Sequence, residues 1–193
     1  MCYHTQITKL LLHLKMENNK NMETDGKMKV IKIKSTWKNL IVFDFDDTLA
    51  KTEEVTLVRD NETNRIIDHL HGQQEFDDYE LDDEKHSFDF SEFLTVSRYA
   101  EPINVTLDLM RDFMLNPNNK VIVLTARQEQ SRQSIKDFLD RQGIESERVS
   151  VFGSGGSKLK AAYLDKLIKR FKIKRAVKVF EDSLDNISDM ISL

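Results

Sequence analysis

The chain has 193 residues, of which 39% are hydrophobic and 32% are charged, and its formal net charge is −4. This length fits one domain, or one domain with a modest insertion, and the apolar fraction is sufficient for a folded core. The negative net charge excludes a global basic field that would hold nucleic acid non-specifically. The single cysteine, Cys2, excludes an intramolecular disulfide and a cysteine-based zinc site, and fits a reducing compartment.

The first 28 residues differ in pattern from the rest of the chain. Their longest apolar stretch, Ile7 to Leu14, is interrupted by Lys9 and His13 and is too short to span a bilayer. No small-residue cleavage site follows it, so we expect a soluble, cytoplasmic protein without a membrane partner. We predict that residues 1–28 are a disordered lead ahead of the apolar segment Lys29 to Ile33. A short partner-binding helix over residues 5–15 is the alternative.

A buried strand and an insertion are predicted next along the chain. Leu40 to Phe43 is a continuous apolar run, which is typical of a central parallel strand that is covered on both faces. Two runs of strand character, Val55–Arg59 and Arg65–Leu70, are separated by a polar turn and predict a hairpin. An acidic segment from Glu75 to Glu84 follows. We therefore predict that residues 50–101 form a small β-rich cap over one end of the sheet.

Helices and strands alternate after this insertion. Three stretches have helical spacing: one that starts at Pro102 and carries Val105, Leu109, Met110 and Phe113 on one side, one from Ile135 to Gln142 that Gly143 ends, and one from Tyr163 to Phe171. Three apolar runs of strand length alternate with them: Val121–Leu124, Val149–Phe152 and Ala176–Phe180. The alternation predicts an α/β fold, with a Rossmann-like parallel sheet and helices on both of its faces.

Three acidic residues and a threonine follow the first apolar run, in the order Asp44-Phe45-Asp46-Asp47-Thr48. Strand alternation places Asp44 and Asp46 on the same side, and open α/β sheets bind ligands beyond the carboxyl ends of their strands. One carboxylate can attack phosphorus and form an aspartyl-phosphate, while a second protonates the leaving oxygen and later deprotonates water. A functionless acidic turn is the simpler alternative, but so many like charges beside a buried strand need a cation between them.

Two further clusters offer groups that bind phosphate oxygens. Thr125 and Ala126 follow the second apolar run, where a hydroxyl and free backbone amides at a helix start would form a phosphate cradle. Lys158 and Lys160 precede the helix that carries Tyr163, and a lysine there can neutralise a transferring phosphoryl group. Each signal is common in unrelated proteins, so neither identifies a site alone.

A last acidic cluster, Glu181 and Asp182, follows the final apolar run. Mg²⁺ prefers hard oxygen ligands and keeps several waters, so a few carboxylates from separate strands are enough to bind it. The predicted ligands are Asp44, the backbone carbonyl of Asp46, and Asp182, and the predicted cofactor is Mg²⁺.

Taken in order, the clusters resemble the four motifs of the haloacid dehalogenase (HAD) superfamily. The resemblance implies a HAD-like core over residues 29–193, with Asp44 as the nucleophile and Asp46 as the general acid/base. The other implied roles concern phosphate and metal: Thr125 and a lysine bind phosphate, Asp182 binds magnesium, and Glu181 assists it.

Within the superfamily, the sequence is most similar to small phage and bacterial phosphatases, a group that includes the 3′-phosphatase domain of polynucleotide kinase. Asp89 to Phe93 resembles the short β-rich element of that group, and Lys160 fits the spacing of its lysine better than Lys158. Glu181 stands where many members carry Asp or Gly, so its contact to the metal is expected to run through water.

The resemblance therefore implies a magnesium-dependent phosphatase. Its expected substrate is a phosphorylated small molecule, such as a nucleotide, or a nucleic-acid 3′-phosphate end. The alternative is a non-catalytic HAD-fold binding protein, in which basic residues between Lys166 and Lys178 would hold nucleic acid. A response-regulator receiver domain is less compatible, because it has no Asp-x-Asp-x-Thr motif.

Overall fold

The computed structural model describes residues 37–192. The predictions for residues 1–28 and for the segment Lys29–Ile33 lie outside the described residues. The centre of the described part is a four-stranded sheet in the order β8-β7-β1-β9, and all of its neighbouring strands are parallel. These strands are β1 (Asn39–Phe43), β7 (Asn119–Thr125), β8 (Ser150–Gly153) and β9 (Ala176–Phe180). All four correspond to the predicted apolar runs, so the prediction of a parallel α/β sheet is confirmed.

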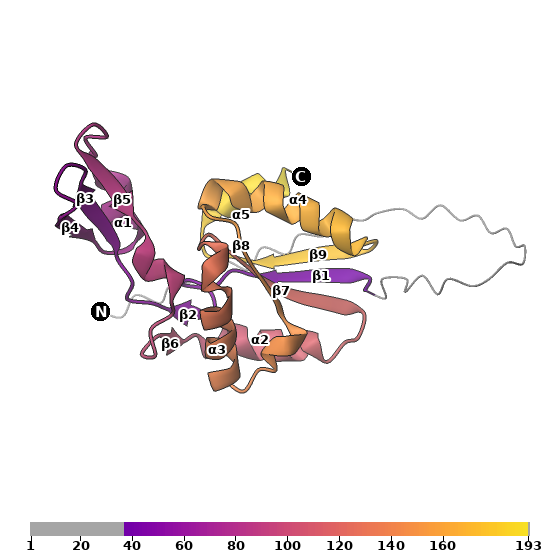
Figure 1. The fold of residues 1–193 in the computed structure, drawn as a ribbon. Helices are drawn as coiled ribbons and strands as arrows, with labels where there is room; N and C mark the ends of the chain where they lie inside the picture. The colour runs from indigo at the N-terminus through magenta and orange to yellow at the C-terminus, as the bar shows by residue number, and fades with distance from the viewer. Residues whose placement is uncertain (1–36, 193) are drawn as a thin grey trace, which may run out of the picture.

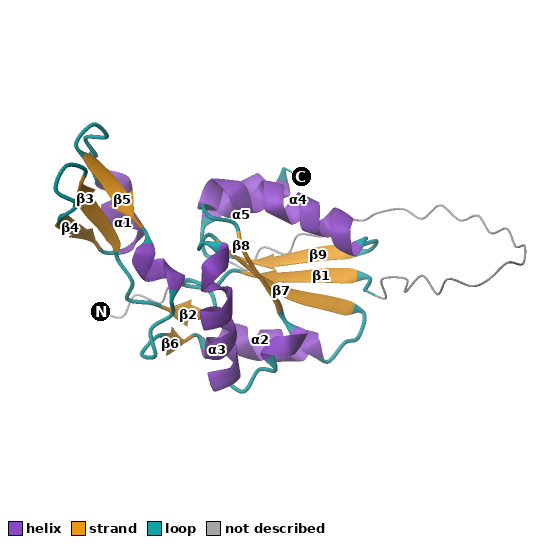
Figure 2. Ribbon diagram, viewed as in Figure 1, coloured by secondary structure: helices purple, strands orange, loops and turns teal. Residues whose placement is uncertain are grey.

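Four helices cover the two faces of this sheet (Figures 1 and 2). They are α2 (Asn104–Met114) and α3 (Arg132–Arg141) on one face, and α4 (Lys160–Phe171) and α5 (Leu184–Ile191) on the other. Along β1, Ile41 and Phe43 face α2 and α3, whereas Leu40 and Val42 face α4 and α5. Alternation along a strand thus supplies two separate cores. Layers of this kind, with helices on both faces, are compatible with a Rossmann-like fold.

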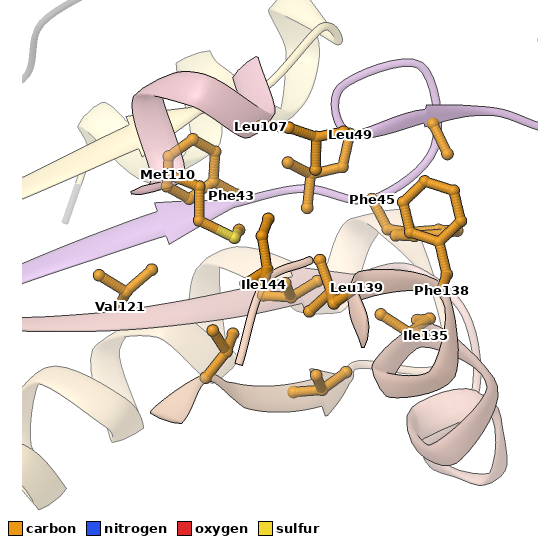
Figure 3. Close-up of a cluster of buried hydrophobic side chains, with 14 of the residues drawn as sticks. Phe43, Phe45, Leu49, Leu107, Met110, Val121, Ile135, Phe138, Leu139 and Ile144 are labelled. Carbon is orange, nitrogen blue, oxygen red and sulfur yellow. The ribbon is translucent and has the colours of Figure 1, made fainter. Parts of the chain in front are cut away.

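Figure 3 shows the core between the sheet and the pair α2–α3. Leu107 and Met110 of α2, Phe43 of β1, and Phe138 and Leu139 of α3 belong to this cluster, and all five are fully buried. Burying an aliphatic or aromatic side chain of this size contributes about 1.5–3 kcal/mol. This packing holds the carboxyl end of β1 in a fixed position.

The predicted start of α2 is wrong. The helix begins at Asn104, and Pro102 lies instead in a short strand that pairs with Ala50. Val105, which was expected on the buried side, is 53% exposed, while Leu107 is fully buried. The other predicted residues do face the core, since Met110 is fully buried and Leu109 and Phe113 pack against the same cluster, so only Val105 departs from the predicted face.

The insertion forms a second sheet beyond the carboxyl ends of β1 and β9 (Figure 1). Its neck is the antiparallel pair β2 (Ala50–Lys51) and β6 (Glu101–Pro102). Its sheet has the order β4-β3-β5, from β3 (Thr56–Asp60), β4 (Ile66–Leu70) and β5 (His86–Asp89). The predicted hairpin is the pair β3–β4, but β5 was not predicted, and neither was α1 (Gly72–Asp78) in the acidic segment.

Short 3₁₀ turns complete the described elements: η1 (Ser91–Leu94), η2 (Glu129–Ser131), η3 (Ser146–Arg148) and η4 (Ser157–Leu159). Gly143 follows α3 with a φ of 71°, the left-handed conformation that ends helices, as predicted. Within residues 37–192, no helix has the length and apolar character needed to cross a membrane.

Candidate active site

The candidate site lies where the order of the sheet reverses. After β1 the chain moves outward to β7 and β8, and it then returns to the other side of β1 to form β9. In open α/β sheets, such a switch point leaves a crevice beyond the carboxyl ends of the two strands. Asp44 follows β1 at this edge, and its backbone N–H donates to Phe180 O at 2.9 Å. Glu181 and Asp182 follow β9 at the same edge.

A buried lysine joins two of these acidic residues. Lys160, the first residue of α4, is 2% exposed, and its Nζ lies 2.8 Å from Asp44 Oδ1 and 2.9 Å from Glu181 Oε2. Glu181 Oε1 also accepts from Asn186 Nδ2 at 3.1 Å. Lys158, the other predicted phosphate lysine, lies exposed in η4. Of the two lysines, the structure therefore brings Lys160 to the acidic cluster.

The charges of this cluster are not balanced. Burial raises the pKa of Asp44 well above its usual range, against the lowering effect of Lys160, and Glu181 and Asp46 raise it further. Partial desolvation of its carboxylate, followed by the charge of Glu181, raises the pKa of Asp182 to about 6. The pKa of Lys160 is raised, because its two carboxylate partners outweigh the burial that would lower it. Three carboxylates thus share one ammonium.

The same three carboxylates could hold a cation. Asp44, Glu181 and Asp182 each offer an oxygen, and these atoms all lie within 4.8 Å of one another. Asp44 Oδ1 is buried and accepts no hydrogen bond from residues 37–192, so its contact to Lys160 is an ion pair only. A buried carboxylate oxygen without a hydrogen bond, beside two further carboxylates, fits a site for a hard divalent cation.

Asp46 lies near Asp44 but has different partners. Its Oδ2 accepts from Arg127 Nε at 3.0 Å, and its Oδ1 accepts from Arg127 Nη2 at 2.8 Å and from Thr52 Oγ1 at 2.8 Å. The Asp46 carboxylate is not part of the group of oxygens that could hold a metal. Asp46 was predicted to act as a ligand through its backbone carbonyl, and this remains a prediction.

Arg127 is the residue of this region that the sequence did not reveal. It follows Thr125 by two residues, and its side chain is only 1% exposed. Burial acts to lower the pKa of its guanidinium, but the charges and hydrogen bonds of Asp46 and Glu54 raise it. An arginine is rarely buried unless it is paired with an acidic residue. The position of Arg127, just after a predicted buried strand, is the feature of the sequence that could have indicated such a pair.

Thr125 and Ala126 form a different structure from the one predicted. The Thr125 hydroxyl accepts from Arg127 N at 3.1 Å, and α3 begins only at Arg132. The expected free amides at a helix start are therefore absent directly after Thr125. Thr125 nevertheless ends β7, the neighbour of β1, and lies two residues beyond the pair Phe43 and Val123. The structure thus places its hydroxyl and the partly buried Ala126 at the same sheet edge as Asp44.

A tight loop presents the acidic residues after β1. Phe45 O accepts hydrogen bonds from the backbone N–H groups of Leu49 at 2.8 Å and Ala50 at 3.1 Å. The buried Phe45 ring packs edge-on against the Phe138 ring, with 5.3 Å between the ring centroids. Asp47 adopts a left-handed φ of 53°, a conformation that Asp tolerates better than most residues. Its pKa is raised by burial and by Asp46. The buried Phe45 ring thus holds the loop in place, and with it the carboxylates of Asp44 and Asp46.

A cavity of about 310 Å³ lies at the opposite edge of the sheet. Trp37, Asn119 and Lys120, at the amino ends of β1 and β7, contribute to its lining. None of the predicted site residues lines it, so it is separate from the acidic cluster.

Searches of protein-family models, of curated proteins and of solved structures find no significant match for the chain. The fold therefore rests on the structure itself, and a function has to be inferred from the chemistry of the residues at the switch point.

Proposed function

We propose that the chain is a magnesium-dependent phosphatase of the HAD type, with Asp44 as its nucleophile. The observation that carries the proposal is the Asp44 carboxylate at the switch point, with Lys160 Nζ 2.8 Å away and the carboxylates of Glu181 and Asp182 within 4.8 Å. This set combines a nucleophile, a buried cation and hard oxygen ligands. Phosphoryl transfer needs these groups because its transition state carries spread negative charge.

In the first half of the proposed reaction, an Asp44 oxygen forms a bond to phosphorus while the bond to the leaving oxygen breaks. Asp46 gives its proton to that leaving oxygen, and an alcohol departs. Lys160 offsets the charge of Asp44 and of the phosphoryl group. Magnesium held by Asp44 and Asp182, with Glu181 assisting, would reduce the repulsion between the carboxylates and the phosphate.

In the second half, Asp46 takes a proton from water, and the water oxygen bonds to phosphorus. The bond between phosphorus and Asp44 breaks, which returns the Asp44 carboxylate and releases inorganic phosphate. Thr125 and Ala126 at the neighbouring strand end would bind phosphate oxygens. The proposed substrate is a phosphorylated small molecule or a nucleic-acid 3′-phosphate end.

A non-catalytic, nucleic-acid-binding role is the second candidate. It is favoured by exposed basic residues in and after the last turns of α4, namely Lys166, Lys169, Arg170, Lys172, Lys174 and Arg175. These residues lie toward the end of α4 that is remote from Lys160, and a helix of this length spans roughly 18 Å. Such a surface could bind nucleic acid without involving the acidic cluster.

Turnover of p-nitrophenyl phosphate separates the two candidates. We expect hydrolysis with magnesium, loss of turnover in EDTA, and recovery when magnesium is restored, while calcium inhibits because of its looser coordination. Asp44→Asn should abolish turnover, because an amide does not attack phosphorus. Lys174→Gln, in the exposed basic surface, is the matched control and should keep full activity. Full turnover in EDTA, or in Asp44→Asn, would contradict the proposal.

A further inference from the structure

Arg127 connects the acidic loop to the insertion. Beside its contacts to Asp46, its Nη2 lies 3.3 Å from Glu54 Oε2, and its Nη1 donates to Thr95 O at 2.6 Å and to Phe93 O at 3.2 Å. The guanidinium is a planar fork of five N–H donors, which can bind several acceptors in fixed directions at once. Here the fork joins the acidic loop at Asp46 to two segments of the insertion, one at Glu54 and one at Phe93–Thr95.

Two of these segments are the legs on which the insertion stands. The first leg, residues 52–55, leaves β2, and the second leg, residues 92–97, leads to β6. The legs also bind each other, because Val55 N donates to Glu92 Oε2 at 3.0 Å and Ser97 N donates to Glu54 Oε1 at 2.9 Å. Arg127 therefore contacts Asp46 through Nε and Nη2, the first leg through Nη2 and the second leg through Nη1.

We infer that Arg127 is a positioning residue that fixes the Asp46 carboxylate. The position of this carboxylate then depends on how the two legs of the insertion pack against Arg127. The inference rests on the proposed function in one respect, since it concerns the acid/base group of that reaction. Arg127 lies behind Asp46 with 1% of its side chain exposed, so it acts through Asp46 and not on the substrate. The insertion is thereby coupled to proton transfer and does more than cover the site.

Glu54→Gln is the sharpest test, because Glu54 contacts Arg127 but has no contact with Asp46. The glutamine keeps an acceptor for Ser97 N and removes only the charge that faces Arg127. We expect turnover of alkyl phosphates to fall several-fold, while turnover of p-nitrophenyl phosphate stays unchanged, because its leaving group needs no proton. The effect should be on kcat, with KM unchanged.

Glu92→Gln is the matched control. Glu92 lies in the second leg and accepts from Val55 N, but it has no contact with Arg127. The same change of charge and shape at Glu92 should leave the ratio of alkyl to aryl turnover as it is in the wild type.

Arg127→Gln should have the larger effect, a loss of about 100-fold on alkyl phosphates from misplacement of the acid. Arg127→Lys should not rescue it, because a point charge does not reproduce the fork that bridges Asp46 and both legs. Where the Arg127 variants fail to fold, the Glu54 and Glu92 pair still decides the outcome.

Amide hydrogen exchange tests the coupling without any turnover. Asp46→Asn removes the charge partner of Arg127, so exchange should become faster in residues 53–55 and 95–97, whereas Asp44→Asn should leave these amides unchanged. If the wild type hydrolyses no phosphate ester but Asp46→Asn still loosens the legs, the coupling stands and the phosphatase proposal fails. The inference is overturned if Asp46→Asn leaves the legs unchanged, or if Glu54→Gln and Glu92→Gln give the same ratio of alkyl to aryl turnover.

Discussion

Asp44 and Asp46 stand two residues apart, yet the structure surrounds them differently. Asp44 shares Lys160 with Glu181 at the edge of the sheet, whereas Asp46 is bound through both oxygens by Arg127. Two carboxylates in different environments can take different roles in one reaction. In the proposed reaction Asp44, with one buried oxygen that accepts no hydrogen bond from the described residues, is the attacking group, and Asp46, held by Arg127, is the group that transfers protons.

The titration of Asp182 gives a prediction for stability. Its pKa of about 6 in the folded protein lies above its ordinary value of 3.8, so the folded state binds a proton more tightly than the unfolded state between these values. By linkage, the contribution of Asp182 to stability should fall as the pH rises from 3.8 to 6. In EDTA, the melting temperature of the wild type relative to Asp182→Asn should therefore decrease over this window.

Taking the difference between wild type and variant removes the titration of distant groups whose pKa is lowered, such as Asp60 and Asp140. Magnesium should raise the melting temperature of the wild type more above pH 6 than below pH 4, because the cation competes with the proton for the same oxygens. A difference that stays flat from pH 3.8 to pH 6 would show that Asp182 has no unusual affinity for its proton.

At the scale of single elements, Gly153 limits where the loop after β7 can lie. A Cβ atom at this position would lie 2.6 Å from Arg127 O and 2.5 Å from Gln128 C, which is too close for backbone atoms. Gly153→Ala must therefore push the loop that carries Arg127 away from β8. We expect the variant to lose about 1–3 kcal/mol of unfolding free energy, which denaturant titration measures.

The control for this substitution is Ser150→Ala at the other end of β8, which leaves the Arg127 loop untouched. It should change the unfolding free energy by much less. An equal free energy of unfolding for Gly153→Ala and the wild type would mean that the loop moves away at little cost. Arg127, which lies on this loop, would then not hold Asp46 rigidly.

The strands and the acidic clusters could be predicted because their signals are local. Leu40–Phe43 and Val121–Leu124 are continuous apolar runs, and residues at the ends of parallel strands must meet at one edge. The pairing of Arg127 with Asp46 could not be predicted, because the two residues are 81 positions apart. No pattern in a single sequence indicates which acidic residue a buried arginine will bind.

The missed elements of the insertion have physical reasons too. The α1 helix has no buried residues, so it lacks the apolar stripe by which a helix is found in a sequence. The four residues of β5, His86–Asp89, are mostly polar, and β5 forms by pairing with β3 from the side opposite to β4. Pairing with a distant strand is a property of the fold that short-range alternation does not contain.

Across the whole molecule, the insertion stands on the core through the short pair β2–β6. The ends of its sheet are neighbours, since Leu57 pairs with Asp89. Residues 56–89 can therefore be replaced by a short Gly-Ser turn that keeps the neck, Glu54 and the second leg. We expect this variant to hydrolyse p-nitrophenyl phosphate as the wild type does, because Asp44, Asp46 and Lys160 remain in place.

The same variant should lose its discrimination among larger phosphate esters, because the sheet of the insertion stands beyond the carboxyl ends of β1 and β9 (Figure 1). A comparison of kcat/KM across phosphorylated metabolites and 3′-phosphorylated oligonucleotides measures this. An unchanged order of preference would mean that the insertion sheet takes no part in substrate choice.

The proposed reaction requires that Asp44 becomes covalently phosphorylated. Rapid acid quenching of the enzyme during turnover of a labelled phosphate ester with magnesium, followed by peptide mass spectrometry, tests it most directly. We expect a hydroxylamine-sensitive phosphoryl group on Asp44, which accumulates in Asp46→Asn and is absent in EDTA and in Asp44→Asn. Turnover without a label on the protein, or a label on any residue other than Asp44, would contradict it.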